Sequence, residues 1–343
     1  MHMRRSVKSA VGLTSLLTLA CTGCSSGGDG SGTTVAGGAP EPSASAPSST
    51  SSTPFEPYVS ATTASDTDSA GSPSTYNLEF VLSDGSSCTP KWSGSYAIGN
   101  SAVKSRISAL KESGAAVRVS FGGATGTELA TVCDSASALA EAYGKALDAA
   151  GTTQADFDLE GTALTDSASI GLRSKAIAIL QKERSDLKVS FTLPVTPSGL
   201  SDDDLAVLDS ANTNAVMVST VNIMAMNYGT SYTGDMGDYA ISAAKAAHDQ
   251  LKDVFALSTA NAWRGLALTA MIGVNDVAGE TFTLSDGAQI RSFAQTNSLA
   301  WLSMWSAFRD QQCDTTASAA DGASTDCSGV EQEDGAFAEA LSG

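Results

Sequence analysis

Histidine is almost absent from this chain, and basic residues are few. The 343 residues include two histidines, His2 and His248, which argues against a histidine-based metal site or a Ser-His-Asp triad. There are 19 Lys and Arg residues against 37 Asp and Glu residues, and the net charge is −18. Nucleic acid and anionic membranes are therefore poor partners for this chain, because they carry the same sign of charge. Any acid–base chemistry must rest on carboxylates.

The N-terminus also lacks an apolar run long enough to span a membrane. Arg4, Arg5 and Lys8 precede the short apolar run Val11–Ala20, a pattern typical of an export signal. The Thr-Gly-Cys sequence that ends at Cys24 resembles a bacterial lipoprotein cleavage box. We therefore predict a signal peptide over residues 1–24 with a lipidated Cys24, and ordinary secretion with cleavage nearby is the alternative.

Large apolar residues are scarce in the next segment too. Residues 25–54 are rich in Ser, Thr, Gly, Ala and Pro, which predicts a flexible linker. From residue 55 to residue 343 the composition is that of a globular protein, without a second linker. We expect one domain there.

Four cysteines remain once the leader is set aside. In an exported chain an even number of cysteines indicates disulfide bonds, and four cysteines allow three pairings. A bond between Cys313 and Cys327 would close a polar loop near the C-terminus, which leaves Cys88 and Cys133 as the second pair. A zinc site is the alternative, although the spacings match no ligand pattern.

Short β-like segments alternate with Ala-rich helical segments through the domain. The predicted strands are 55–61, 76–82, 117–121, 155–160, 187–193, 221–226, 270–274 and 299–304, and the clearest helices are 135–149, 167–185, 235–251 and 285–296. This order predicts an α/β fold, a (β/α)8 barrel, although the first two connections look like loops. A doubly wound sheet is the alternative, but no Gly-rich phosphate loop follows the first strand. The short connections leave no room for a large insertion domain.

The fourth predicted strand carries acids at every second position. Asp156, Asp158 and Glu160 alternate with Phe157 and Leu159, so the acids share one face of the strand. Three neighbouring carboxylates cannot all ionise cheaply in a water-poor site, and at least one pKa must rise. We interpret the segment as a general acid with supporting carboxylates. An exposed sheet edge and a calcium site are the alternatives.

Five segments at predicted strand ends resemble motifs of the glycoside hydrolase family 18 chitinases, in particular the secreted actinobacterial type. They are Ser120-Phe121-Gly122-Gly123, Asp156-Phe157-Asp158-Leu159-Glu160, Met224-Ala225-Met226-Asn227-Tyr228-Gly229, Met271-Ile272-Gly273-Val274-Asn275-Asp276 and Leu302-Ser303-Met304-Trp305-Ser306. The first resembles the family's SxGG motif and the second its DxDxE motif. The resemblance covers about residues 55 to 343.

The resemblance implies substrate-assisted catalysis by three acids, without a metal or a cofactor. Glu160 would protonate the glycosidic oxygen and later activate water. Asp158 would hold the 2-acetamido group of the sugar, whose carbonyl oxygen attacks to form an oxazolinium ion. Asp156 would share a proton with Asp158.

The resemblance also implies a set of substrate-binding residues. Trp305 would stack on the sugar, with an ordinary core tryptophan as the alternative. The other residues of this set are Gly122, Gly123, Met226, Asn227, Tyr228, Asn275 and Asp276. For the glycines the alternative is a tight turn after a strand, and for Asn275 and Asp276 it is a polar turn. Met226 and Asn227 stand where the family often has Tyr and then Asp.

These features together predict an endo-acting chitinase that cleaves β-1,4-linked N-acetylglucosamine polymers with retention. Its partners would be chitin or N-acetylglucosamine oligosaccharides, and we expect a monomer, either extracellular or lipid-anchored on the outer face of a bacterial membrane. The alternatives are an endo-β-N-acetylglucosaminidase acting on glycoproteins, a non-catalytic sugar-binding module and a scaffold lipoprotein.

Overall fold

The computed structural model describes residues 52–313 and 323–343. The predicted signal peptide with Cys24, and the linker up to residue 51, lie outside the described residues. Within the two described ranges, no helix is long and apolar enough to cross a membrane. Export and lipidation therefore stay predictions.

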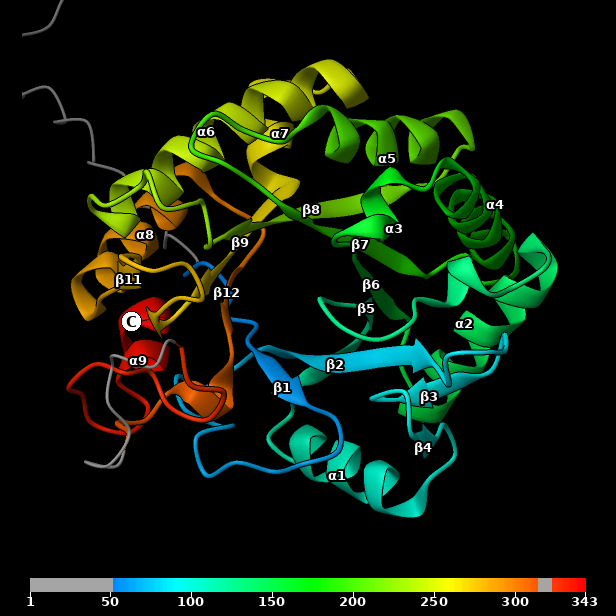
Figure 1. Cartoon of the computed structure of the whole chain (residues 1–343), viewed down its shortest axis with the longest axis horizontal. Helices are drawn as coiled ribbons and strands as arrows, with labels where there is room; N and C mark the ends of the chain where they lie inside the picture. Colours follow the sequence, from blue (N-terminus) through cyan, green and yellow to red (C-terminus); the bar gives the residue numbers. More distant parts are fainter. Residues whose placement is uncertain (1–51, 314–322) are drawn as a thin grey trace, which may run out of the picture. The chain divides into compact units, whose positions relative to one another are not determined.

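Eight parallel strands form a closed barrel (Figure 1). They are β1 (Tyr58–Ser60), β2 (Thr75–Ser83), β5 (Ala116–Gly122), β6 (Gln154–Asp158), β7 (Lys188–Pro194), β8 (Val218–Ala225), β9 (Leu266–Met271) and β12 (Leu302–Trp305). Each strand pairs in parallel with the next in this order. A parallel bridge between Phe55 and Leu302 joins the last strand to the segment before the first. The predicted (β/α)8 barrel is confirmed, and the doubly wound sheet is excluded.

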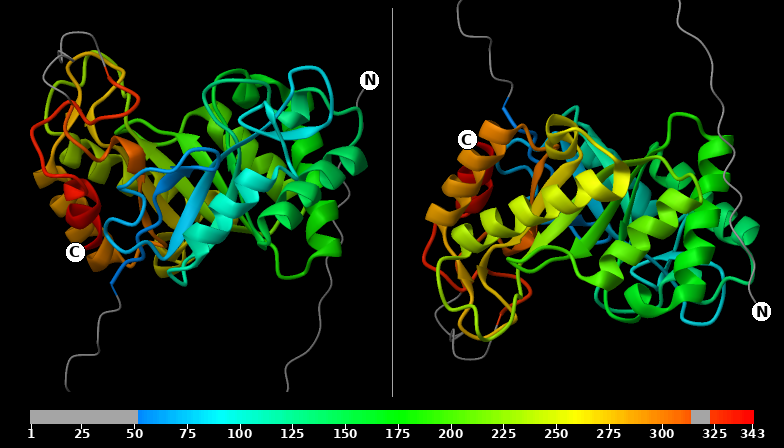
Figure 2. Two further views of the ribbon diagram at one scale, coloured as in Figure 1. Left: turned by 90° about the horizontal axis from the view of Figure 1, so that it is seen from below. Right: turned by 90° about the horizontal axis from the view of Figure 1, so that it is seen from above.

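Helices surround the ring of strands (Figure 1). They are α1 (Ser101–Lys111), α2 (Ala136–Ala150), α3 (Thr162–Thr165), α4 (Ser167–Glu183), α5 (Asp202–Thr213), α6 (Met236–Phe255), α7 (Thr259–Arg264), α8 (Leu284–Asn297) and α9 (Ala336–Ser342). Four short strands lie outside the barrel path: β3 (Pro90–Trp92), β4 (Tyr96–Ala97), β10 (Gly273–Val274) and β11 (Thr281–Phe282). Figure 2 shows the β3–β4 and β10–β11 segments at the same end of the barrel.

Local sequence signals set several helix ends. Ser201 and Asp204 form a capping box at the start of α5, and Thr283 and Asp286 form another at the start of α8. Each box satisfies backbone N–H groups that have no partner inside the helix. The helix α2 ends at Gly151, which adopts a left-handed conformation with φ of 61°.

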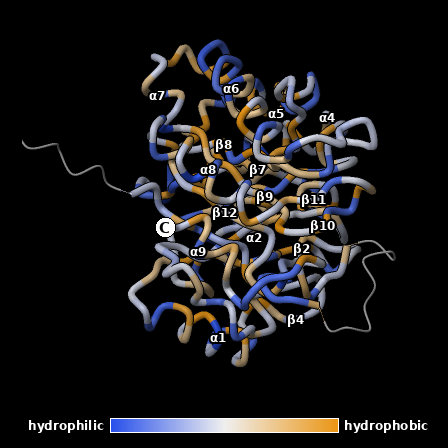
Figure 3. Tube along the Cα trace, turned by 90° about the vertical axis from the view of Figure 1, so that its left-hand side faces the viewer, coloured by the Kyte–Doolittle hydropathy of each residue, from blue (hydrophilic) through white to orange (hydrophobic). Residues whose placement is uncertain are grey.

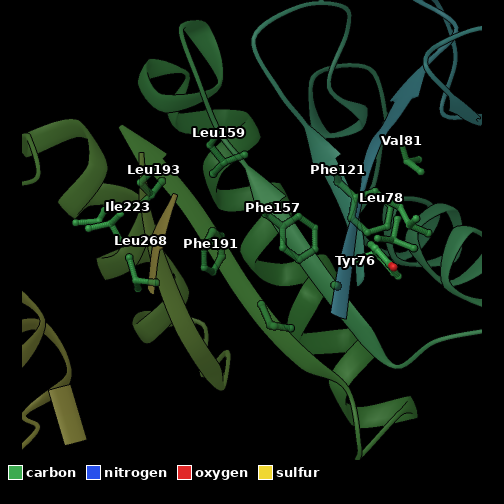
Figure 4. Close-up of a cluster of buried hydrophobic side chains, with 14 of the residues drawn as sticks. Tyr76, Leu78, Val81, Phe121, Phe157, Leu159, Phe191, Leu193, Ile223 and Leu268 are labelled. Atoms are coloured by element: carbon green, nitrogen blue, oxygen red, sulfur yellow. The ribbon is translucent and has the colours of Figure 1, made fainter. Parts of the chain in front are cut away.

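Phenylalanine rings from three neighbouring strands form part of the core outside the barrel (Figure 4). Phe121, Phe157 and Phe191 lie in register on β5, β6 and β7. The ring centroids are 5.3 Å apart for the first pair and 5.7 Å apart for the second. Tyr143 of α2 packs on the first two rings, so all three rings face the helices. The residues on either side of each ring therefore face the barrel interior.

The hydropathy of the chain follows the same division between buried and exposed faces. Figure 3 shows apolar segments concentrated on the inner part of the molecule and hydrophilic ones toward its outside. The strand β9 is apolar except for Thr269, and all six of its residues are buried. Burial on both faces is what parallel strands covered by helices require.

Several predicted strands and connections differ from the structure. The seventh barrel strand begins at Leu266 rather than at residue 270, and residues 273 and 274 belong to β10. The second connection, which looked like a loop, contains α1, whose start is capped by the side chain of Asn100. The acidic strand ends at Asp158, so Glu160 lies just beyond it.

Both predicted disulfides are present. Cys88 is bonded to Cys133, and Cys313 is bonded to Cys327. The first bond ties the loop after β2 to the segment before α2. Since the four sulfur atoms are bonded in pairs, the zinc alternative is wrong.

Candidate active site

The acidic strand β6 lies inside the barrel wall, between β5 and β7. Asp156 is 1% exposed and Asp158 is 5% exposed, and both face the barrel interior. The alternative of an exposed sheet edge is therefore wrong. Glu160 follows at the C-terminal end of the strand, where (β/α)8 barrels carry their catalytic residues.

Four hydroxyl groups hold Asp156. Its Oδ2 accepts hydrogen bonds from Tyr58 at 3.1 Å and Ser120 at 2.7 Å. Its Oδ1 accepts from Ser190 at 2.6 Å and Thr192 at 2.9 Å. These contacts fix the carboxylate at the base of the site. None of these four bonds involves Asp158, and the sharing of a proton between Asp156 and Asp158 stays a prediction.

Asp158 and Glu160 form a hydrogen-bonded pair of acids. Burial raises the pKa of Asp158 well above its ordinary value, and the charges of Glu160, Asp156 and Glu79 raise it further. Burial also raises the pKa of Glu160, while the hydrogen bond with Asp158 lowers it and the charge of Asp276 raises it. The pair therefore keeps a proton to higher pH than an isolated carboxyl would. Asp158 Oδ1 is buried and has no hydrogen-bond partner.

A cavity of about 360 Å³ lies against this pair of acids. Its walls are formed by Tyr58, Phe80, Ala124, Thr125, Asp158, Glu160, Thr192, Met224, Met226, Asn227, Thr269, Met271, Asp276, Trp305 and Thr325. Apolar walls with a few convergent polar groups are typical of small-molecule sites. Two hollows of about 390 and 440 Å³ include the N-terminal ends of strands, away from the acids. The cavity of about 360 Å³ is therefore the candidate site.

Trp305 forms part of this cavity wall, which favours the predicted contact with substrate over a core tryptophan. Its indole Nε1–H donates a hydrogen bond of 3.1 Å to Glu79 Oε2 on β2. The guanidinium of Arg309 lies 5.4 Å from the ring centroid, and Phe308 packs edge-on at 6.2 Å. Burial raises the pKa of Glu79 to about 7, with the Trp305 hydrogen bond acting in the opposite direction.

Gly122 and Gly123 are required by close contacts inside the protein. Both have positive φ, 104° and 93°. A Cβ atom on Gly122 would lie 2.1 Å from the carbonyl oxygen of Asp158, and one on Gly123 would lie 2.9 Å from the ring of Phe80. The backbone N–H of Gly123 also donates to the Asp158 carbonyl at 2.9 Å. This is the tight turn of the alternative interpretation, and a sugar contact at these glycines stays a prediction.

Asn227 and Asp276 meet at the rim of the cavity. Asn227 Nδ2 donates to Asp276 Oδ2 at 3.1 Å, and Asn227 Oδ1 accepts from the backbone N–H groups of Asp276 and Val277 at 3.0 and 3.3 Å. An aspartate at position 227 could not donate to Asp276 and would repel it. The amide therefore explains the departure from the family's usual Asp at this position.

Asn275 and Tyr228 are not part of the cavity wall. Asn275 is 2% exposed, and its Nδ2 donates to the carbonyl oxygens of Met271 and Gly273, as in a polar turn. Tyr228 packs with Tyr232 and Tyr239 at ring distances of 5.8 and 6.0 Å. Substrate contacts from Asn275 and Tyr228 stay predictions.

Several residues of the site were not expected from the sequence. They contact the acids or Trp305, and they are Tyr58, Glu79, Ser190 and Thr192. A signal for two of them was available, because Ser190-Phe191-Thr192 repeats the alternation of Asp156-Phe157-Asp158. The pairing of β6 with β7 places these two segments in register.

Known proteins resemble both the sequence and the structure of this chain. No protein-family model matches it. A segment of 249 residues is 36% identical to a probable bifunctional chitinase/lysozyme of Escherichia coli K12, and it covers 68% of this chain and 28% of that protein. A segment of 248 residues is 34% identical to endochitinase 11 of Metarhizium anisopliae, over 68% of this chain and 47% of that protein. The chain thus spans less than half the length of either relative.

The structure resembles that of a chitinase domain over most of its length. The catalytic domain of a hyperthermophilic chitinase from Pyrococcus furiosus aligns with a TM-score of 0.73 and 29% sequence identity, over 84% of this chain and 95% of that domain. The chain is thus similar in sequence to these chitinases and in fold to a chitinase catalytic domain.

Proposed function

We propose that this chain is an endo-acting chitinase that hydrolyses β-1,4-linked N-acetylglucosamine polymers with retention. The observation that carries the proposal is Asp158 Oδ1, a buried acceptor without a partner, in the same cavity wall as Glu160 and Trp305. A buried acceptor is costly to leave unpaired. The N–H group of a 2-acetamido sugar stacked on Trp305 would supply the missing donor.

Substrate binding would move the shared proton to the acid that needs it. Donation from the acetamide N–H to Asp158 favours the ionised form of Asp158, so the proton passes to Glu160. Glu160 then protonates the glycosidic oxygen while the bond between that oxygen and C1 breaks. The acetamide carbonyl oxygen bonds to C1, and the carboxylate of Asp158 offsets the positive charge of the oxazolinium ion.

The second half of the reaction reverses the role of Glu160. Its carboxylate takes a proton from water while the water oxygen attacks C1 and the bond between C1 and the acetamide oxygen breaks. Two displacements at C1 leave the anomeric configuration unchanged. Glu160 regains its proton, and the four hydroxyl donors hold Asp156 in place throughout.

Endo action is supported by the short connections around the site. Between β9 and α8 the chain forms only the β10–β11 hairpin, so no insertion domain raises a wall there. One relative is itself an endochitinase. We also propose that the enzyme is of the secreted actinobacterial type and is exported, either free or anchored through Cys24, and that it acts as a monomer. Replacing Cys24 with alanine would then remove any lipid label from cell-bound protein.

The test uses the full chain and chitin hexasaccharide. Wild-type protein should release short products of retained anomeric configuration, as observed by NMR and mass spectrometry. Glu160→Gln should lower kcat by about 10²- to 10⁴-fold, whereas the matched control Glu141→Gln, at an exposed glutamate on α2, should not. Equal rates for wild type and Glu160→Gln would refute the proposal.

Two further substrates separate the alternatives. A fully deacetylated hexasaccharide should not be cleaved, because it lacks the acetamide carbonyl that acts as nucleophile. Release of N-glycans from a glycoprotein without cleavage of the chitin hexasaccharide would instead indicate an endo-β-N-acetylglucosaminidase. Binding of chitin oligosaccharides without cleavage would indicate a sugar-binding module.

A further inference from the structure

A carboxylate outside the DxDxE motif contacts the sugar-stacking residue of the site. Glu79 lies on β2 and pairs with Ser60, the last residue of β1. Since β1 is three residues long and lies between β2 and β12, it ends at the level of Glu79. The hydrogen bond from Trp305 to Glu79 therefore connects β2 to β12 at the point where β1 no longer separates them.

This bond controls the orientation of the Trp305 ring. The indole Nε1–H is the ring's sole hydrogen-bond donor, and Glu79 Oε2 accepts from it at 3.1 Å. Arg309 and Phe308 pack against the ring without such a directional contact. Rotation of the ring away from Glu79 would leave a half-buried donor and a half-buried acceptor unpaired, so the ring is held in place.

The charge of Glu79 also reaches the acids of the site. It is one of the three carboxylates that raise the pKa of Asp158. The other ionisable groups of the site are Asp156 and Glu160, which act on Asp158, Tyr58 on β1 and Arg309, which lies over the Trp305 ring. Because the pKa of Glu79 is about 7, its charge changes near neutral pH, where the site would be at work.

We propose that Glu79 is a positioning residue, which accepts the hydrogen bond of the Trp305 indole and so holds the ring for sugar stacking. This proposal rests on the proposed function for its kinetic consequences. Substitutions can separate the hydrogen bond of Glu79 from its charge, because an amide retains the acceptor oxygen but removes the charge.

The kinetic test compares Glu79→Gln with Glu79→Ala on a fluorogenic chitotrioside over a range of pH. Glu79→Ala should raise KM about tenfold, since the loss of about 1.4 kcal/mol of ordering corresponds to a factor of ten. Glu79→Gln should keep KM within about twofold of wild type. Both variants lack the charge of Glu79, which raises the pKa of Asp158. The limb of the kcat/KM profile that reports the ionisation of Asp158 should therefore move to lower pH in both.

A second measurement does not depend on turnover. The indole N–H signal of Trp305 in the NMR spectrum of the full chain, assigned by its loss in Trp305→Phe, should shift with a midpoint near pH 7, the pKa of Glu79. In Glu79→Gln this titration should vanish. An inactive wild type with an intact titration would overturn the proposed function and leave the role of Glu79 standing.

Two results would overturn the role of Glu79. One is an indole signal of Trp305 that does not respond to pH or to Glu79→Gln. The other is a folded Glu79→Ala variant with the KM and pH profile of an active wild type. If Glu79→Ala does not fold, Trp305→Phe removes the same hydrogen bond from the other side and should raise KM to a similar extent.

Discussion

Replacing Gly122 with alanine should disrupt the site without touching any acid. A Cβ atom at this position would lie 2.1 Å from the carbonyl oxygen of Asp158, whereas a carbon–oxygen contact needs about 3.3 Å. The ends of β5 and β6 would have to separate by roughly 1 Å. That movement would break the hydrogen bond from Gly123 to the same carbonyl and displace Asp158.

The expected losses follow from these contacts. A non-glycine residue at φ of 104° costs about 1–3 kcal/mol, and the lost backbone hydrogen bond adds about 1 kcal/mol. Stability should therefore fall by about 3 kcal/mol, or by roughly 6–12 °C in Tm for a domain of this size. A displacement of about 1 Å at a catalytic group can lower kcat about 100-fold.

A second glycine provides the matched control. Gly114 has a similar backbone conformation, with φ of 88°, but a Cβ atom there would meet nothing within 4 Å. Gly114→Ala should show the strain alone, about 1–2 kcal/mol in a thermal melt, with unchanged kcat. A kcat of Gly122→Ala within threefold of that of Gly114→Ala on the same chitotrioside would show that the close approach of Gly122 to the Asp158 carbonyl does not position the acid.

Three other outcomes are expected. Asp276→Asn removes a charge that raises the pKa of Glu160, so the alkaline limb of the kcat profile should move to lower pH. An unmoved limb would mean that Glu160 is not the general acid. Replacing Cys313 and Cys327 by serine should lower kcat/KM severalfold, because the cavity residue Thr325 lies inside the loop that their disulfide closes. An unchanged kcat/KM would show that this disulfide does not support the cavity wall. Tyr228→Phe should leave kcat within about twofold, since the hydroxyl group has no hydrogen-bond partner, and a tenfold loss would mean that it reaches the substrate.

The acids could be recognised in the sequence because they alternate with large apolar residues. Alternation of Asp156, Phe157 and Asp158 puts carboxylates on one face of a strand and a phenyl ring on the other. In a buried parallel strand only a functional site tolerates such a face. The order of strands and helices likewise predicted parallel strands, since parallel neighbours need a crossover between them.

Contacts between residues far apart in the sequence could not be predicted from local patterns. Glu79 and Trp305 are 226 positions apart, and no local pattern links a single glutamate to a single tryptophan. The role of Asn227 depends on Asp276 in another loop, so the sequence showed only a departure from the family's Asp. Asn275 and Tyr228 were expected to bind substrate. The Asn275 side chain donates to a backbone carbonyl group and the Tyr228 ring packs against Tyr232, and their contacts with substrate stay predictions.

The sequence by itself therefore predicted a parallel α/β fold, paired cysteines and the alternation of Asp156, Asp158 and Glu160 with apolar residues, because each follows from periodicity, count or spacing along the chain. Tertiary structure alone decided which acids share a hydrogen bond, which residues form the cavity wall and which carboxylate holds Trp305. Those facts depend on distances between strand ends, and barrel closure brings these ends together from all parts of the chain.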